Sequence, residues 1–211
     1  MAHPGQDLST GSALAISNFK HPTYVVRRKI FKLFGGAFHI YDPMGNVAFY
    51  SEMKAFKLKE DIRLYTGEDK QTEILTIKAR NILDISATYD VFDPRTDQKV
   101  GALRRKGLKS MLRDEWLFLD NSDQEIGKIE EDSMLMAVVR RLLMNLTEQV
   151  NLIPQSYQGE IGGAPVCTFK QNFNPFVLKV NLDFSIDQHN RLDRRLGIAA
   201  AVLLCAIEGR Q

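Results

Sequence analysis

The densest group of chemically useful side chains in this sequence is a run of cations that we call the basic rim. Its members are Arg104, Arg105, Lys106, Lys109 and Arg113. Guanidinium groups bind phosphate oxygens in pairs and ammonium groups add point charge, so the run predicts a site for a phosphorylated lipid head group. The alternative is a solvated strand end whose charges keep a sheet edge from aggregating.

Three other basic groups are weaker candidates. Arg27, Arg28 and Lys29 fall on an expected strand, where alternation places successive side chains on opposite faces and makes a poor pocket. The pairs at 140–141 and 194–195 fall on expected helices. Pairing with nearby acids is the simpler interpretation there.

The sequence offers little for catalysis or metal binding. It contains four histidines, His3, His21, His39 and His189. Their spacing is not that of metal ligands, and no nucleophile has a recognisable partner base. The glycine pairs at 35–36 and 162–163 lack the context of a phosphate-binding loop and are typical of hairpins. We therefore predict a protein that is not an enzyme, with no catalytic residue, metal or cofactor.

Length and composition are those of an ordinary globular protein. The chain has 211 residues, 44% of them hydrophobic and 26% charged, which predicts one domain with a sizeable core. The net charge of +2 is too small to predict a nucleic-acid partner. Cys167 and Cys205 are far apart, so we expect two small buried thiols in a reducing compartment. Residues 1–22 lack a secretion signal and predict a loosely ordered tail on a cytoplasmic protein.

The elements that must position these side chains are mostly short strands. The pattern predicts strands over 24–32, 37–41, 47–51, 55–59, 62–65, 73–79, 155–161, 165–171 and 176–186. A hairpin pattern occurs three times, at 37–51, 89–101 and 116–127. In each, a turn that begins with Asp lies between a strand with an aromatic residue and a returning strand. Strands this short and frequent favour an antiparallel sandwich or barrel.

Two segments predict helices. Residues 133–149 carry one apolar stripe, which favours packing against the sheet, although a basic amphipathic helix also suits a membrane surface. Leu196–Ile207 is apolar all round and follows Asp193, a good helix cap. A bilayer requires about 20 apolar residues, so we interpret this helix as a buried core rod and not as a membrane anchor.

These elements together resemble the tubby C-terminal superfamily, and within it the phospholipid scramblase and LURP-one-related branch. The resemblance is carried by residues 38–46, the unit at 89–101, and residues 181–184 with 192–201. It implies a mainly β fold over 23–211, a closed antiparallel barrel of about 12 strands around a central hydrophobic C-terminal helix. The helix near 133–149 would be additional to that barrel.

The resemblance also implies non-enzymatic work at membranes. Tubby relatives bind phosphoinositide head groups, scramblases are linked to calcium-dependent lipid movement, and plant LURP-one-related proteins are associated with defence. This chain lacks a scramblase's Pro-rich arm and Cys cluster, and residues 187–193 place an Arg where a calcium ligand would be needed.

The functional expectation is a phospholipid-binding or scramblase-like module that acts through the basic rim at the cytoplasmic face of a membrane. Anionic phospholipids would then be its partners. The alternatives are a protein-interaction or scaffold barrel without lipid activity, and an enzyme that uses a pocket at the barrel mouth.

Overall fold

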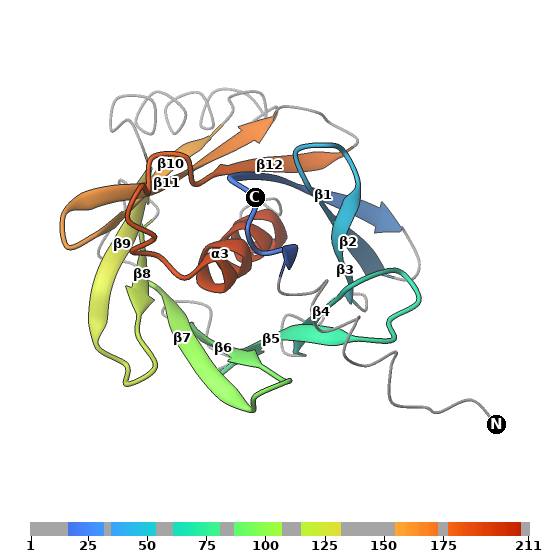
Figure 1. Ribbon diagram of the computed structural model, residues 1–211, viewed down its shortest axis with the longest axis horizontal. Helices are drawn as coiled ribbons and strands as arrows, with labels where there is room; N and C mark the ends of the chain where they lie inside the picture. Colours follow the sequence, from blue (N-terminus) through green and yellow to red (C-terminus); the bar gives the residue numbers. More distant parts are fainter. Residues whose placement is uncertain are drawn as a thin grey trace, which may run out of the picture.

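The computed structural model describes residues 17–31, 35–53, 61–80, 87–106, 115–131, 155–172 and 177–207. Twelve antiparallel strands in these segments close into a barrel, and the helix α3 (Arg194–Ile207) runs through its centre (Figure 1). The predicted class, a mainly β closed barrel around a hydrophobic C-terminal helix, is confirmed. The helix predicted near 133–149 and the strand predicted at 55–59 lie outside the described residues.

Strands that are neighbours in sequence are neighbours in the barrel. In chain order they are β1 (Thr23–Phe31), β2 (Gly35–Tyr41), β3 (Val47–Met53), β4 (Ile62–Tyr65), β5 (Glu73–Ala79), β6 (Thr88–Asp93), β7 (Gln98–Arg105), β8 (Glu115–Leu119), β9 (Glu125–Glu131), β10 (Ser156–Ile161), β11 (Ala164–Asn172) and β12 (Leu178–Asp183). The barrel closes because β1 pairs with β2 on one side and with β12 on the other. Closure leaves no free sheet edge.

Five hairpins turn at the end of the barrel where α3 begins, and each has a register shift beside its turn. Such bulges increase local twist and are common at barrel rims. The three repeated units share an aspartate whose Oδ1 accepts backbone N–H groups: Asp42 from Met44 and Asn46, Asp93 from Arg95, and Asp120 from Ser122 and Gln124. The repeated Asp-led hairpin is therefore confirmed.

The helix α3 fills the barrel, since every residue from Leu196 to Ala206 is buried. Its first turn is capped as predicted, because Oδ1 of Asp193 accepts the N–H of Arg195 at 2.9 Å. A Cβ added at Gly197 would lie 2.4 Å from a ring carbon of Phe184, so glycine permits this close approach. The core-rod interpretation is confirmed by this burial.

The described residues contain no helix that is long and apolar enough to cross a membrane.

The other end of α3 is held by a side chain from the barrel wall. Nη1 of Arg28 lies 3.3 Å from the carbonyl oxygens of both Cys205 and Ala206, to which it donates. A cation suits this end because the last carbonyls of a helix carry partial negative charge. Cys167 and Cys205 are free and buried as predicted, and burial raises the pKa of the Cys205 thiol to about 12.

Two sequence predictions are wrong in detail. The long strand expected over 176–186 is shorter, because the N–H of Asp187 donates to the carbonyl of Phe184 and turns the chain toward α3. Ile186, expected on the buried face, is therefore 46% exposed. Gly35 and Gly36, expected between strands, belong to β2 and pair with β1.

Contacts with the barrel extend upstream of Thr23. The ring of Phe19 packs on Phe49 at 4.6 Å between centroids, and Nδ2 of Asn18 donates to the carbonyl of Ala48. The Tyr24 hydroxyl donates to the carbonyl of Asn18.

Candidate anion-binding surface

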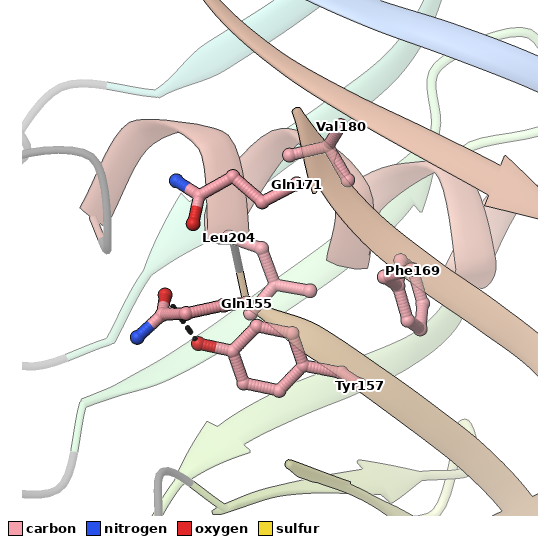
Figure 2. Close-up of a pocket in the computed structure, with 6 residues that line it drawn as sticks. All are labelled: Gln155, Tyr157, Phe169, Gln171, Val180 and Leu204. Atoms are coloured by element: carbon pink, nitrogen blue, oxygen red, sulfur yellow. Dashed lines mark hydrogen bonds between the residues drawn. The ribbon is translucent and has the colours of Figure 1, made fainter. Parts of the chain in front are cut away.

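The barrel interior leaves little room for a ligand in the part of the chain that the structure describes. A small pocket with a volume of about 10 Å³, partly open to solvent, lies where α3 ends (Figure 2). Its lining is Gln155, Tyr157, Phe169, Gln171, Val180 and Leu204. The Tyr157 hydroxyl donates to Oε1 of Gln155 at 2.9 Å, and this lining holds no acid, histidine or cysteine that could serve as a base or nucleophile.

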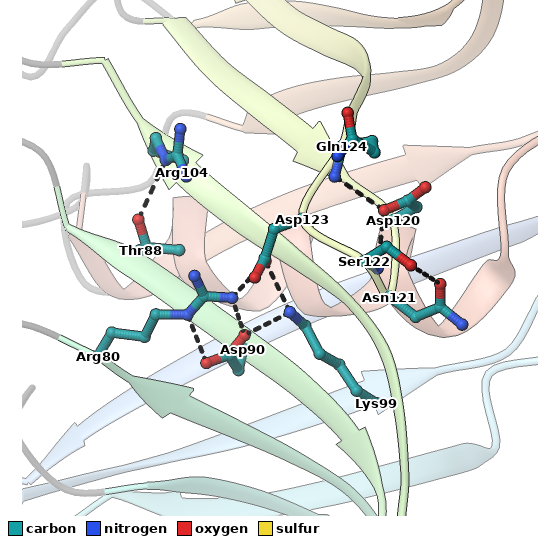
Figure 3. Close-up of polar contacts among 10 residues, drawn as sticks. All are labelled: Arg80, Thr88, Asp90, Lys99, Arg104, Asp120, Asn121, Ser122, Asp123 and Gln124. Carbon is teal, nitrogen blue, oxygen red and sulfur yellow. Dashed lines mark hydrogen bonds and ion pairs between the residues drawn. The ribbon is translucent and has the colours of Figure 1, made fainter.

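The basic rim does not form one cluster in the described residues. Nε of Arg104 donates to the Thr88 hydroxyl at 3.3 Å (Figure 3), and Nζ of Lys106 pairs with Oε1 of Glu115. Arg104 and Arg105 are consecutive on β7, so their side chains point to opposite faces of the wall. Lys109 and Arg113 lie outside the described residues.

Other cations near Arg104 are neutralised by acids. Arg80 makes two hydrogen bonds to Asp90, and both Arg80 and Lys99 pair with Asp123 at the tip of the β8–β9 turn (Figure 3). On this wall Arg104 and Lys78, which lies opposite Asp90, form no ion pair with an acid of the described residues.

The strand register assembles a second group of cations, which we call the basic wall. It consists of Arg27 and Lys29 on β1, Lys179 on β12 and Lys170 on β11. Arg27 lies directly opposite Lys179, and Lys170 is opposite Asn181, two residues along β12 from Lys179. Their strand neighbours Val26, Arg28, Val180 and Phe169 face the core, so these four side chains face outward.

The basic wall lacks compensating acids. None of its four cations forms an ion pair with an acid of the described residues. The nearest outward acid on β12, Asp183, accepts the backbone N–H of Ser185 at 2.7 Å. Like charges placed directly opposite each other on neighbouring strands destabilise a sheet, so the pairing of Arg27 with Lys179 has a cost that no acid of the described residues offsets.

His39 borders the basic wall on β2, directly opposite Arg27. Its Nε2 lies 2.7 Å from Oε1 of Glu68, and its side chain is 6% exposed. Nδ1 of His39 and Nε of Arg27 are both buried without a hydrogen-bond partner. The surface thus contains two unpartnered polar atoms on neighbouring residues.

No arrangement of three or more His, Cys, Asp or Glu side chains suited to a metal occurs within the described ranges. In residues 187–193 the carboxylate of Asp187 is occupied by backbone hydrogen bonds. Its oxygens accept the N–H groups of Arg191 and Leu192 at 2.9 and 3.1 Å. These bonds orient the link that leads into α3.

Comparison with known proteins places the chain in a family. A family model described as LURP-one-related matches residues 47–205, which is more than half of the chain. The chain belongs to the LURP-one-related family. No match was found among curated proteins or among solved structures.

In this LURP-one-related barrel the matched residues begin at Val47 and therefore exclude β1 and β2. The basic wall includes residues from both sides of this boundary, because Lys170 and Lys179 lie within the matched range and Arg27 and Lys29 precede it. Closure of the barrel brings the two parts together through the β1–β12 pairing.

Sequence reasoning missed the basic wall. It correctly predicted that residues 27–29 alternate between faces, since Arg28 points inward to α3 while Arg27 and Lys29 point outward. What it missed is the contribution of Lys170 and Lys179, which are more than a hundred residues away in sequence. The alternation of β11 and β12 could have predicted that Lys170 and Lys179 point outward. Only the strand register shows that these lysines lie beside β1.

Proposed function

We propose that this LURP-one-related protein is a non-enzymatic module that binds anionic phospholipid head groups on the outside of its barrel and so associates with membrane surfaces. The observation that carries the proposal is the unneutralised pairing of Arg27 with Lys179 in the basic wall. The resemblance to tubby and scramblase proteins, noted from the sequence, supports the same class of ligand.

The filled interior supports an external binding surface. A helix buried over its whole middle occupies the space that an enclosed ligand would need. Phosphate groups suit the basic wall because Arg contributes a planar fork of donors and Lys a mobile point charge. The basic rim stays a proposed contributor, with Arg104 its outward cation that has no acidic partner among the described residues.

Vesicle sedimentation tests the proposal. We expect the protein to bind vesicles that contain phosphatidylserine and to be released by salt, since screening shortens the range of charge attraction to about 10 Å at 0.1 M. Each basic residue near an anionic surface contributes about 1 kcal/mol. The double variant Arg27→Gln with Lys179→Gln should therefore bind roughly 30-fold more weakly.

The matched control is Arg104→Gln with Lys106→Gln, which removes the same charge from the basic rim. We expect it to weaken vesicle binding by about fivefold at most, the effect of Arg104 alone, since Lys106 is already paired with Glu115. Equal losses in both double variants would assign the binding to net charge and overturn the role of the basic wall. A wild-type protein that ignores the vesicles at low salt would overturn the proposed function in favour of a protein-interaction barrel.

A further inference from the structure

We propose that exposed apolar side chains at one end of the barrel enter the membrane interface while the basic wall contacts the lipid head groups. We call these side chains the apolar tip, and they are Met44, Val47 and Ile186. The inference rests on the proposed function, because it concerns the same membrane. It adds a surface of different chemistry and orients the barrel, with β12, β1 and β2 toward the lipid.

The first step is the exposure of the apolar tip. The described residues expose three large apolar side chains, Met44 at 76%, Val47 at 37% and Ile186 at 46%. Single exposed apolar side chains are normal on protein surfaces. These three, however, belong to only two segments, the β2–β3 turn with the first residue of β3, and the link that follows β12.

The second step is the position of these segments. β2 and β12 pair with opposite sides of β1 and both end beside its first residues. Tyr41 of β2 is opposite Val25, and Asp183 of β12 is opposite Thr23. Neighbouring strands are about 4.8 Å apart, so about 10 Å separates the ends of β2 and β12. Figure 1 shows β12, β1 and β2 side by side. The apolar tip and the basic wall therefore share one sector of the barrel.

The third step is the fixed conformation of the β2–β3 turn. Oδ1 of Asp42 accepts the N–H groups of Met44 and Asn46, both at 2.9 Å. The corresponding positions in the other two repeated hairpins hold polar residues, Arg95 and Ser122, whose side chains form hydrogen bonds within their own turns. The turn geometry thus does not require an apolar residue. Of the three equivalent turns, only this one presents a large apolar side chain to solvent.

The fourth step is the depth of the cations behind the apolar tip. Lys170 is opposite Asn181, two residues before the end of β12, and Lys179 is four residues before that end. At about 3.4 Å per residue and a strand tilt of about 40°, these levels lie about 5 and 10 Å from the strand end along the barrel axis. Apolar groups at a membrane interface are buried about 5–10 Å deep. Insertion of the apolar tip therefore brings the basic wall to the head groups.

The charges of this sector favour a bilayer over a neutral apolar partner. Two outward acids are near the strand ends, and both have polar contacts: Asp183 accepts the N–H of Ser185, and Glu68 is hydrogen-bonded to Nε2 of His39. The four cations of the basic wall have no acidic partner among the described residues. Apolar side chains in front of unpaired cations match an anionic phospholipid surface, which offers acyl chains and phosphates at successive depths.

The test places a fluorescent probe on the apolar tip. Both cysteines of the chain, Cys167 and Cys205, are buried, so an exposed cysteine introduced by mutation can be labelled selectively. Met44→Cys carrying a nitrobenzoxadiazole probe is mixed with vesicles of phosphatidylserine and phosphatidylcholine. We expect its emission to shift to shorter wavelength and to be quenched by lipids that carry a spin label in the acyl chain.

The control for the probe is Ser122→Cys. It places the same label at the equivalent turn position of the β8–β9 hairpin, and β8 is six strands away from β2 around the barrel of twelve. Its emission should neither shift nor be quenched by the acyl spin label.

The second measurement is the affinity for the same vesicles. The variant Met44→Gln with Ile186→Gln keeps the net charge and removes the apolar surface. We expect it to bind at least about tenfold more weakly, because two large side chains lose their favourable transfer from water. The matched control, Met44→Leu with Ile186→Leu, keeps the apolar surface and should bind within about twofold of wild type. Circular dichroism checks that each variant is folded, as expected for exposed positions.

The outcomes separate the two proposals. Vesicle binding with unchanged emission from labelled Met44→Cys, or with wild-type affinity in the glutamine variant, overturns the insertion and leaves the proposed function standing. The apolar tip would then be a surface for a protein partner. Equal spectral shifts in labelled Met44→Cys and Ser122→Cys overturn the proposed orientation. Absence of wild-type binding overturns the proposed function itself.

Discussion

At the scale of single residues, two adjacent arginines on β1 have opposite roles. Arg28 points into the barrel and donates to the last carbonyls of α3, so its charge is used by the fold. Arg27 points outward toward Lys179 and has no acidic partner in the described residues. A stabilising arginine and a candidate ligand-binding arginine therefore differ only in strand parity.

The network around Asp123 shows the opposite arrangement, in which every charge is paired. Hydrogen bonds from Arg80 and Lys99 lower the pKa of Asp123 to about 2. Burial alone would raise the pKa of Asp90, but hydrogen bonds from Arg80 and Lys99 hold it below its usual range. Both carboxylates thus favour the folded state when they are ionised.

This network predicts a pH dependence of stability. The folded pKa of Asp123 lies below its ordinary value of 3.8, so its contribution is present above that value and is lost as the pH falls toward about 2. In Asp123→Asn, the drop in the free energy of unfolding between about pH 5 and about pH 2.5 should be smaller than in wild type. Urea denaturation at both pH values measures it.

Asp97→Asn is the matched control. Asp97 and Asp123 both occupy a turn with positive φ, 53° and 66°, a conformation that Asn tolerates well. Asp97 forms no ion pair among the described residues, so its variant should retain the wild-type pH dependence. Equal curves for wild type and Asp123→Asn would show that the network contributes nothing to acid sensitivity.

At the scale of elements, α3 depends on one close approach. The Phe184 ring lies against Gly197 and is itself held between Tyr24, at 6.2 Å between centroids, and the Arg194 guanidinium, at 4.3 Å from the ring centroid. The ring therefore has little freedom to move away. A larger residue at Gly197 has to displace either the ring or the helix.

We predict that Gly197→Ala destabilises the protein. Alanine gains about 1 kcal/mol of helix propensity, but overpacking a filled core costs about 1–3 kcal/mol. The added Cβ would meet two ring carbons of Phe184 at 2.4 and 2.5 Å, so overpacking should prevail. Chemical denaturation should show a net loss, and Phe184→Leu in the same chain should recover part of it. A stabilised single variant would mean that the ring yields easily.

At the scale of the whole molecule, the barrel and its helix form one core. One buried cluster includes at least one residue of every strand, together with Leu196 and every residue of α3 from Ile198 to Ala206. A charge placed on the helix has no route to solvent. The chain should therefore fold as a unit or not at all.

We predict that Ala201→Arg prevents folding, because Ala201 is fully buried and an unpaired buried charge costs several kcal/mol. Ile186→Arg is the control, since Ile186 is 46% exposed and surface changes usually stay within about 0.5 kcal/mol. Circular dichroism and solubility distinguish the two. A folded Ala201→Arg protein would show that α3 is not enclosed by the barrel in solution.

Much of this fold could be predicted from the sequence. β4 and β5 have the predicted bounds, 62–65 and 73–79, and α3 begins beside its predicted cap at Asp193. These features are local: alternation, a capping side chain and an Asp-led turn are encoded within a few residues. The end of β12 could not be predicted, because the turn after Asp183 depends on where the chain must enter the barrel.

The sequence by itself determined the strands, the hairpin turns and an apolar helix that had to be enclosed, since each follows from local periodicity and composition. Only the tertiary structure decided which cations meet. Arg27 becomes a neighbour of Lys179 and His39 through the pairing of β1 with β12 and β2, and Arg28 reaches the end of α3 because its strand parity points it inward. Closure of the barrel pairs the first strand with the last. The hydrogen-bond register of that pair cannot be predicted from the sequence of either strand alone.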